Sequence, residues 1–252
     1  MLMKANLLKK GIIFDFDDTI ANTRPGKDVA LKIISAKIRD YLKKEKINLN
    51  LNKLSRTIRK VEEEMDAKRI YDRNMWWSFV LRKFSEKKSL KIFLNSLTKE
   101  YWKTVIEKSR LYKDTIPTLS YLKNKGYTLG LLTDTDGLKG EKLKRIRLLD
   151  LEKWFNSIII SGEHTKEVKP DPTPFYLISK EINLKPTECV YVGNNPISDI
   201  QGAKKADMMA ILMKRGNSRI KVKPSLIVRE LSALKKSFNW NWQIRFLLTS
   251  LK

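Results

Sequence analysis

Three aspartates follow a short apolar run near the start of the chain. The residues GIIF are followed by Asp15, Phe16, Asp17 and Asp18. Ionised carboxylates this close together repel one another, and gathering them is costly unless a cation offsets their charge. A carboxylate can also attack phosphorus, and a second carboxylate beside it can act as general acid and base. The pattern therefore predicts a bound cation and phosphoryl chemistry at these aspartates.

Polar side chains stand at the ends of other apolar runs or soon after them. With the first pair, the set comprises Asp15 and Asp17, Thr133 and Asp134, Lys169, and Asn194 and Asp199. In an open parallel sheet the carboxyl ends of the strands meet at one edge, where ligands bind. Carboxylates, a hydroxyl, an ammonium group and an amide at that edge could position and neutralise a phosphoryl group.

The residues of this set can be given chemical roles. Asp15 could attack phosphorus and form an acyl phosphate. It cannot approach an anionic phosphate unless its own charge is offset, which Mg²⁺ and Lys169 could do together. Asp17 could protonate the leaving oxygen and later deprotonate water. The set therefore fits transfer of a phosphoryl group in two steps.

The elements that must position these residues follow from the apolar pattern. Short, nearly continuous apolar runs, which are typical of buried strands, occupy residues 11–16, 127–133, 157–161, 189–193 and 209–213, with a further candidate at 224–228. Helical segments separate the later runs, so we expect an α/β fold with a parallel sheet covered on both faces. From about residue 27 to residue 110 apolar residues recur at spacings of three and four, which predicts a helical insert.

The polar motifs, taken in order, resemble those of a known superfamily. DFDDT, LLTD, VKPDP and GNNPISD are similar to the four motifs of haloacid dehalogenase-like hydrolases, and the helical insert sits where those proteins have a cap. The resemblance implies a Rossmann-like core of residues 1–24 and 111–252 and a helical cap of residues 25–110. It also implies a Mg²⁺ cofactor and an aspartyl-phosphate intermediate.

The resemblance also implies roles for individual residues, taken from the matching positions of the family's motifs. Asp15 is the nucleophile, and Asp17 is the acid and base, with its backbone carbonyl also reaching the metal. Thr133 and the backbone amide of Asp134 bind phosphate, and Lys169 bridges phosphate and nucleophile. A leaving-group acid at Asp17 points to the phosphatase branch rather than to the dehalogenases.

One position departs from the pattern of the superfamily. The expected metal ligands are Asp15, Asp17, Asn194 and Asp199, but the fourth motif usually begins Gly-Asp where this chain has Gly-Asn. An amide oxygen can bind Mg²⁺ but brings no charge, so we expect weaker metal affinity. Asp199 could compensate directly or through water.

Several residues also have purely structural interpretations. Asp15 and Asp17 taken alone fit a turn or a helix cap, and Asp199 fits a helix N-cap. His164, the only histidine, stands in a loop and is interpreted as incidental. Asp136 in TDTDG could suggest a second metal site, but a turn explains it more simply.

Two features of the helical insert bear on function. Trp76 and Trp77 stand side by side, and packing in the core explains at least one of them. Arg73, just before them, is the residue of the insert that we expect to meet a distal anionic or polar group of a substrate.

The charge of the chain limits the kinds of partner. Its 252 residues include 52 Lys and Arg against 28 Asp and Glu, a formal charge of +24. The basic residues are spread along the chain, which favours a solvated surface that also attracts anionic substrates, with a nucleic-acid partner as the alternative. The single cysteine, Cys189, excludes an intramolecular disulfide framework. Without a recognisable membrane span or secretory signal, we expect a cytoplasmic protein with no membrane partner.

These observations lead to one functional prediction with two alternatives. We expect a Mg²⁺-dependent phosphomonoester hydrolase that acts on a small phosphorylated metabolite, as a monomer or homodimer. A phosphomutase of the same superfamily is the chemical alternative. A non-catalytic, basic nucleic-acid-binding member is the alternative from another class.

Overall fold

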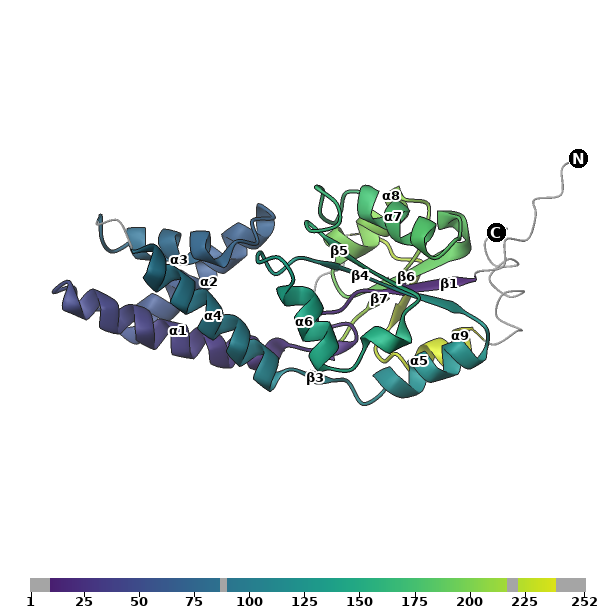
Figure 1. Ribbon diagram of the computed structural model, residues 1–252, viewed down its shortest axis with the longest axis horizontal. Helices are drawn as coiled ribbons and strands as arrows, with labels where there is room; N and C mark the ends of the chain where they lie inside the picture. Colours follow the sequence, from purple (N-terminus) through teal and green to yellow (C-terminus); the bar gives the residue numbers. More distant parts are fainter. Residues whose placement is uncertain (1–9, 87–89, 217–221, 239–252) are drawn as a thin grey trace, which may run out of the picture. The chain divides into compact units, whose positions relative to one another are not determined.

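The chain folds into two compact units. The computed structural model describes residues 10–86, 90–216 and 222–238 (Figure 1). Unit 1 consists of the described residues of Met1–Asn22, Leu111–Asp134 and Ile146–Lys252. Unit 2 consists of the described residues of Thr23–Arg110 and Thr135–Arg145.

Unit 1 is built on a parallel β-sheet. Among the described residues this sheet has six strands in the order β5–β4–β1–β6–β7–β8, and each neighbouring pair is parallel. The strands are β1 (Gly11–Phe14), β4 (Thr128–Asp134), β5 (Ser157–Ser161), β6 (Cys189–Gly193), β7 (Met209–Met213) and β8 (Leu226–Val228). The expected α/β class with a Rossmann-like parallel sheet is confirmed.

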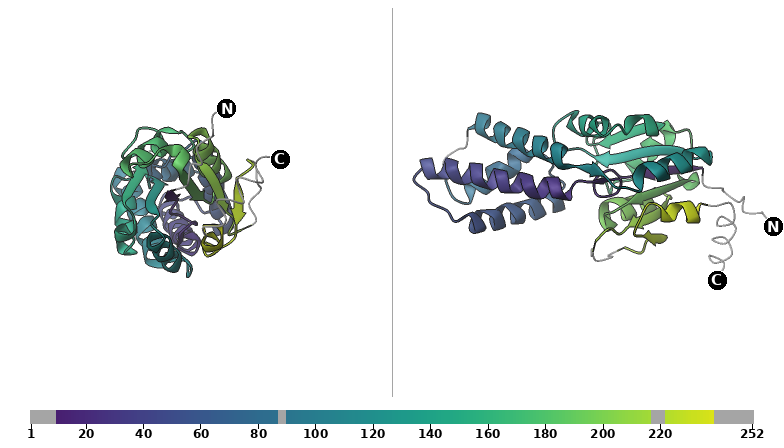
Figure 2. Two further views of the ribbon diagram at one scale, coloured as in Figure 1. Left: turned by 90° about the vertical axis from the view of Figure 1, so that its right-hand side faces the viewer. Right: turned by 90° about the horizontal axis from the view of Figure 1, so that it is seen from below.

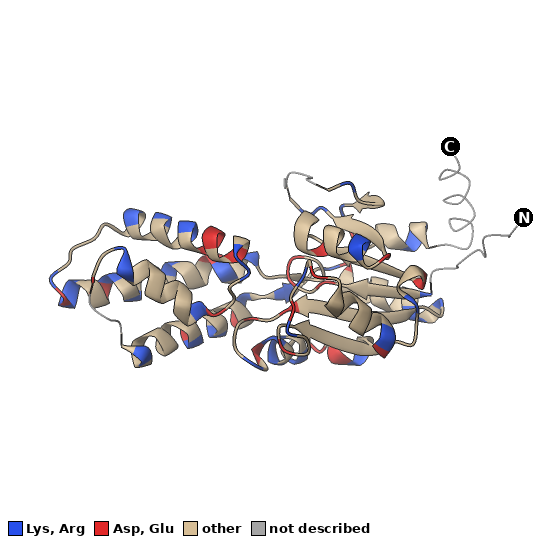
Figure 3. Ribbon diagram, turned by 90° about the horizontal axis from the view of Figure 1, so that it is seen from above, with Lys and Arg blue, Asp and Glu red and all other residues tan. Residues whose placement is uncertain are grey.

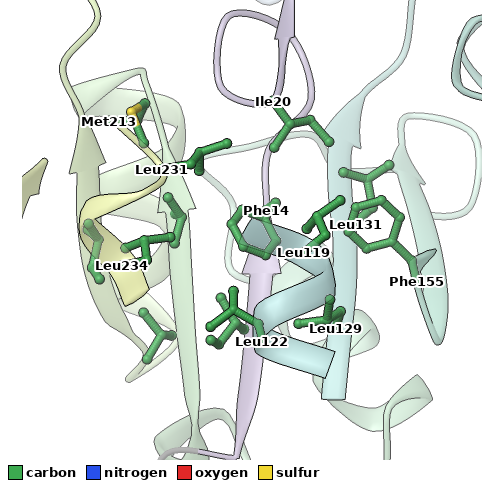
Figure 4. Packing of buried hydrophobic residues seen from close by; sticks show 14 of the residues in the cluster. Phe14, Ile20, Leu119, Leu122, Leu129, Leu131, Phe155, Met213, Leu231 and Leu234 are labelled. Atoms are coloured by element: carbon green, nitrogen blue, oxygen red, sulfur yellow. The ribbon is translucent and has the colours of Figure 1, made fainter. Parts of the chain in front are cut away.

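Helices cover both faces of this sheet because successive strand residues point to opposite sides. Ile12 and Phe14 of β1 belong to one apolar cluster, which also contains residues of α5 and α9, whereas Ile13 belongs to a second cluster with residues of α7 and α8. The helices are α5 (Thr115–Asn124), α7 (Thr173–Glu181), α8 (Gly202–Lys205) and α9 (Ala233–Ser237). Figure 4 shows Phe14 packed beside Leu119 of α5. The near-continuous apolar strands are thus buried on both faces.

The apolar runs located the strands closely. The strands at residues 157–161, 189–193 and 209–213 have the expected bounds. The first strand is two residues shorter than expected, because Asp15 and Phe16 already lie outside it. Short elements complete the described chain: β2 (Ala21–Asn22), which pairs with β3 (Arg110–Leu111), and the helical turns η1 (Glu152–Trp154), η2 (Pro186–Glu188) and η3 (Pro196–Gln201).

Unit 2 is helical. It contains α1 (Arg24–Lys44), α2 (Leu51–Ala67), α3 (Arg73–Arg82), α4 (Lys91–Lys108) and the beginning of α6 (Glu141–Leu148). Helix α1, purple in Figure 2, packs against α4 and α2, and α3 packs against the same two helices. The apolar stripe of α2 predicted by its spacing faces inward. Trp76 and Trp77 are both buried in the same core, where at least one of them was expected.

The structure adds residues 135–145 to the helical unit, whereas the sequence interpretation placed them in the core domain. Three contacts explain the difference. Leu138 packs against the apolar cluster of unit 2. The Arg145 guanidinium carbon lies 5.1 Å from the ring centroid of Trp102. Gly137 adopts φ +82°, and a Cβ atom there would lie only 2.0 Å from the carbonyl oxygen of Tyr71.

Alanine at Gly137 is expected to destabilise the protein by about 3 kcal/mol or more, because a left-handed backbone angle and a direct overlap with Tyr71 add together. Gly140 is a matched control, since its φ is +83° and its Cβ would meet nothing within 4 Å. Gly140→Ala should cost only about 1 kcal/mol. Urea unfolding of both variants measures the difference, and equal losses would show that the close approach to Tyr71 contributes nothing.

Lys and Arg are spread over the helices of both units rather than gathered on one element (Figure 3). This distribution fits a solvated basic surface. In the described part of the chain, no helix has the length and apolar character needed to cross a membrane.

Candidate active site

The structure brings the predicted site residues to the carboxyl edge of the sheet in unit 1. They follow β1 (Asp15 and Asp17), end β4 (Thr133 and Asp134), stand in the loop after β5 (Lys169), or follow β6 (Asn194 and Asp199). Strand β1 lies between β4 and β6, and the chain passes from one side of β1 to the other after β5. This reversal of strand order is the place where open α/β sheets bind ligands.

The sheet itself fixes Asp15. Its backbone N–H donates to the carbonyl oxygen of Val192 at 2.9 Å, which extends the pairing of β1 with β6 by one residue. The residue is 4% exposed. One carboxylate oxygen accepts a hydrogen bond from the hydroxyl of Thr19 at 3.1 Å, and the other accepts one from Lys169 at 2.8 Å. Asp15 is therefore held in one orientation at the end of the central strand.

Lys169 lies at the centre of a buried polar cluster. Its ammonium nitrogen is 2.8 Å from Asp15 Oδ1, 2.8 Å from Asp199 Oδ1 and 3.1 Å from the hydroxyl of Tyr191. These acceptors match the three N–H groups of an ammonium. Burial alone would lower the pKa of Lys169, but the two carboxylates outweigh it and hold this pKa well above its usual value. The lysine therefore stays charged.

The carboxylates around Lys169 leave this edge short of positive charge. Burial raises the pKa of Asp15 to about 7, against the opposing attraction of Lys169. The charges of Asp199 and Asp17 act in the same direction as burial. A single buried ammonium thus faces several carboxylates, and an additional cation would lower the energy of the ionised Asp15.

The contacts of Asp199 exclude one of its two interpretations, the helix N-cap. Asn195, not Asp199, caps η3, since its side chain accepts hydrogen bonds from the N–H groups of Ile197 and Ser198. Asp199 is 1% exposed and accepts from Lys169 on one oxygen and from the N–H of Asn195 at 2.8 Å on the other. The N-cap interpretation of Asp199 is therefore wrong, and its carboxylate positions the lysine.

Gly193 makes this approach of Asp199 geometrically feasible. A Cβ atom at Gly193 would lie 2.5 Å from the carboxylate carbon of Asp199. Any larger residue at the end of β6 would therefore displace Asp199, and with it the partner of Lys169.

The other predicted residues stand at the same edge of the sheet. Asp17 is half-buried and pairs with Ala21 in an isolated bridge, and Thr133 is 2% exposed. The carboxylate of Asp134 accepts hydrogen bonds from the hydroxyl of Ser161 and from the backbone N–H of Lys169. Asp134 therefore ties the loop that carries Lys169 to the end of β4.

The metal-ligand assignment stays a prediction. Among residues 10–86, 90–216 and 222–238, no three His, Cys, Asp or Glu side chains are arranged as a metal-binding group. The predicted ligand set depends instead on mixed donors, because it includes the amide of Asn194, which is half-buried, and the backbone carbonyl of Asp17. Mixed carboxylate, amide and carbonyl oxygens are donors that suit Mg²⁺.

Sequence reasoning missed two kinds of residue. Tyr191 looked like an ordinary strand residue, but its hydroxyl contacts Lys169 and donates to the carbonyl oxygen of Leu132 at 2.9 Å. Its position two residues before the end of β6 was the available signal. Asp136 was interpreted as a turn residue, but it is 3% exposed and pairs with Arg145.

His164 accepts a hydrogen bond from the backbone N–H of Ile160, which fits its incidental interpretation.

Comparison with known proteins identifies the family. Residues 12–213 match the haloacid dehalogenase-like hydrolases. The chain belongs to this family. Members of the family generally use Mg²⁺.

Individual relatives agree with this assignment. A glyceraldehyde 3-phosphate phosphatase from Methanopyrus kandleri is 28% identical over 208 residues, which cover 82% of this chain and 84% of the relative. The crystal structure of a phosphatase of the family from Thermococcus onnurineus has a TM-score of 0.70 and 26% identity, covering 90% of this chain and 96% of that one. A magnesium-bound putative hydrolase from Bacillus subtilis, at 20% identity, shares the fold with a TM-score of 0.70 and covers 91% of this chain and 98% of that one.

Proposed function

We propose that this protein is a phosphatase that hydrolyses small phosphate monoesters through a phosphorylated Asp15. One observation carries the proposal: a buried carboxylate at the end of the central strand is held 2.8 Å from a charged lysine, which a second carboxylate fixes in place. This arrangement suits attack by Asp15 on phosphorus with Lys169 neutralising charge on the phosphoryl oxygens. The matching relative from Methanopyrus kandleri, a phosphatase of a triose phosphate, supports a small phosphorylated substrate.

In the first step, an oxygen of Asp15 forms a bond to phosphorus while the bond from phosphorus to the ester oxygen breaks. Asp17 gives its proton to the departing oxygen, so that an alcohol leaves rather than an alkoxide. Lys169, Thr133 and the backbone amide of Asp134 donate to the phosphoryl oxygens as negative charge builds up on them.

In the second step, a water molecule attacks the phosphorus of the acyl phosphate. Asp17, now ionised, takes a proton from this water, and the bond between phosphorus and the oxygen of Asp15 breaks. The products are inorganic phosphate and the original carboxylate of Asp15. Asp17 therefore acts as acid in the first step and as base in the second.

The residues at this edge fit a divalent cation, because their donor atoms are oxygens and their net charge is negative. Asp15, the backbone carbonyl of Asp17 and Asn194 would hold Mg²⁺, with Asp199 as a further ligand or as the positioning partner of Lys169. When bound, Mg²⁺ would supply positive charge that lets Asp15 and the anionic phosphate approach each other.

Aspartate in place of Asn194 is expected to tighten Mg²⁺ binding by about tenfold, because a carboxylate adds charge to the ligand set. Calorimetric titration with Mg²⁺ measures the affinity, and Asn195→Asp serves as the neighbouring control that alters charge nearby. An unchanged affinity in Asn194→Asp, or an equal change in the control, would exclude Asn194 as a ligand.

The proposed function is tested by phosphate release from a panel of small esters, including glyceraldehyde 3-phosphate, phosphoglycolate and sugar phosphates, with Mg²⁺ and with EDTA. We expect release that requires the metal. Formation of an isomer without free phosphate would indicate a phosphomutase. If no ester releases phosphate and the protein binds DNA or RNA in a salt-sensitive way, the nucleic-acid alternative is favoured.

A further inference from the structure

Arg215 is a largely buried arginine of unit 1 that the proposed mechanism does not use. It stands two residues after β7, and its side chain is 11% exposed. Its Nε donates to the carbonyl oxygen of Thr19 at 3.2 Å, and its Nη2 donates to Asp114 Oδ1 at 3.1 Å. The guanidinium carbon lies 3.6 Å from the ring centroid of Tyr112. Two acceptors along one edge and an aromatic ring on one face therefore fix the guanidinium.

Asp114 anchors Arg215 instead of capping a helix. It has the residue type and the position of an N-cap for α5, yet its side chain makes no capping hydrogen bond. One carboxylate oxygen accepts from Arg215, and the other accepts from the backbone N–H of Leu231 at 2.6 Å. The carboxylate is therefore held from two sides and gives Arg215 a fixed partner.

The apolar core holds the segments of this network together. Ile20, Met213 and Leu231 belong to one buried cluster, and all three are labelled in Figure 4. Ile20 directly follows Thr19, and Met213 ends the strand that precedes Arg215. The contact between Arg215 and Thr19, 196 positions apart in the chain, thus rests on packed segments.

Thr19 lies in the tight loop that follows β1. Within this loop the N–H groups of residues 19–21 share the carbonyl oxygen of Phe16 at 3.1 to 3.4 Å. In the described part of the chain, the only hydrogen bond to Thr19 from outside the loop is the one that Arg215 donates. The orientation of the Thr19 carbonyl group therefore depends on Arg215.

Thr19 links this contact to the nucleophile. It is 0% exposed, and its hydroxyl donates to Asp15 Oδ2 at 3.1 Å. Lys169 donates to the other oxygen, so the two contacts together fix the plane of the Asp15 carboxylate. A rotation of the Thr19 backbone would move its hydroxyl as well as its carbonyl group. A donor that holds the carbonyl oxygen therefore also holds the hydroxyl in place.

We propose that Arg215 is a positioning residue for phosphoryl transfer. It keeps the hydroxyl of Thr19 directed at Asp15, and so keeps the attacking carboxylate in one orientation. This role rests on the proposed phosphatase function. Two simpler roles must be separated from it: an ion pair that only stabilises the fold, and a positive charge that only attracts an anionic ester.

The first test needs no turnover. Crystal structures of the wild type and of Arg215→Met are compared without substrate. We expect the hydroxyl of Thr19 to lie beyond hydrogen-bond distance of Asp15 in the variant, and an unchanged contact would overturn the proposal. Absence of phosphate release by the wild type would instead count against the proposed function and leave this structural result standing.

The second test is a double-mutant cycle with Thr19→Val, which removes the hydroxyl at nearly constant shape. Because Arg215 acts through Thr19, Arg215→Met should lower kcat about tenfold while KM stays within about twofold of the wild type. In the Thr19→Val background the same substitution should lower kcat by less than about twofold. A stabilising ion pair alone would give equal factors in the two backgrounds, and that result would overturn the proposal.

Two further variants test the role of charge. Arg215→Lys keeps the charge and leaves Asp114 a cationic partner, so it carries both tests if Arg215→Met does not fold. A lysine cannot bridge two acceptors along one edge, so its kcat should stay at least about fivefold below that of the wild type. Arg229→Met removes an exposed charge just after β8 and should leave kcat unchanged. Full activity in Arg215→Lys, or an equal loss in Arg229→Met, would show that charge alone matters and overturn the proposal.

Discussion

Asparagine in place of Asp15 is expected to lower the rate of phosphate release by about 10⁴-fold or more, which is the scale for loss of a nucleophile. The amide is neutral and cannot form the acyl phosphate. Its carbonyl oxygen can still accept the hydrogen bond that Lys169 donates at 2.8 Å. Because burial raises the pKa of Asp15, its ionised form is disfavoured in the fold, and a neutral side chain should cost little stability.

Asp18→Asn is the matched control for this substitution. Asp18 is also buried, stands three residues further along and adopts φ 59°, an angle that asparagine tolerates well. It has no assigned chemical role, so we expect activity within about threefold of the wild type. Substantial activity in Asp15→Asn, or equal losses in the two variants, would show that Asp15 is not the nucleophile.

Methionine in place of Lys169 is expected to reduce both activity and stability. The substitution leaves Asp15 and Asp199 buried without their shared cation, which typically costs about 3–5 kcal/mol. It also removes the charge that neutralises the phosphoryl oxygens, so the rate should fall by about 10²- to 10³-fold or more. Urea unfolding and phosphate release measure the two losses separately.

The double variant Lys169→Met, Asp199→Asn separates the two effects. It removes the second buried carboxylate, and the asparagine oxygen can still accept from the N–H of Asn195, so much of the lost stability should return. Activity should not return, because no cation faces the phosphate. Recovery of activity together with stability would mean that Lys169 acts only as a structural partner of Asp199.

The strands and the neighbourhood of the site were predictable because they depend on local pattern. Nearly continuous apolar runs identify buried strands, and the carboxyl ends of parallel strands must meet at one edge. That rule placed Asp15, Thr133 and Lys169 together although Asp15 and Lys169 are 154 positions apart. The order of the motifs along the chain then indicated the family.

The detailed contacts were not predictable because they depend on partners that no local pattern specifies. Asp199 had the right residue type for a helix N-cap, but Asn195 occupies that role and leaves Asp199 to Lys169, 30 positions away. An apolar pattern counts Tyr191 by its ring alone and gives no information about the contacts of its hydroxyl. The segment from residue 135 to 145 follows a core strand, yet its packing partners, such as Trp102, come from the helical insert.

The most direct test of the central claim is to trap the phosphorylated side chain. The enzyme is quenched during turnover of its best ester and treated with borohydride, which reduces an acyl phosphate to an alcohol, and the peptide containing residue 15 is analysed by mass spectrometry. The account predicts homoserine in place of Asp15 only when substrate has been present. Phosphate release with an unmodified Asp15, or with the reduced residue at another aspartate, would contradict it.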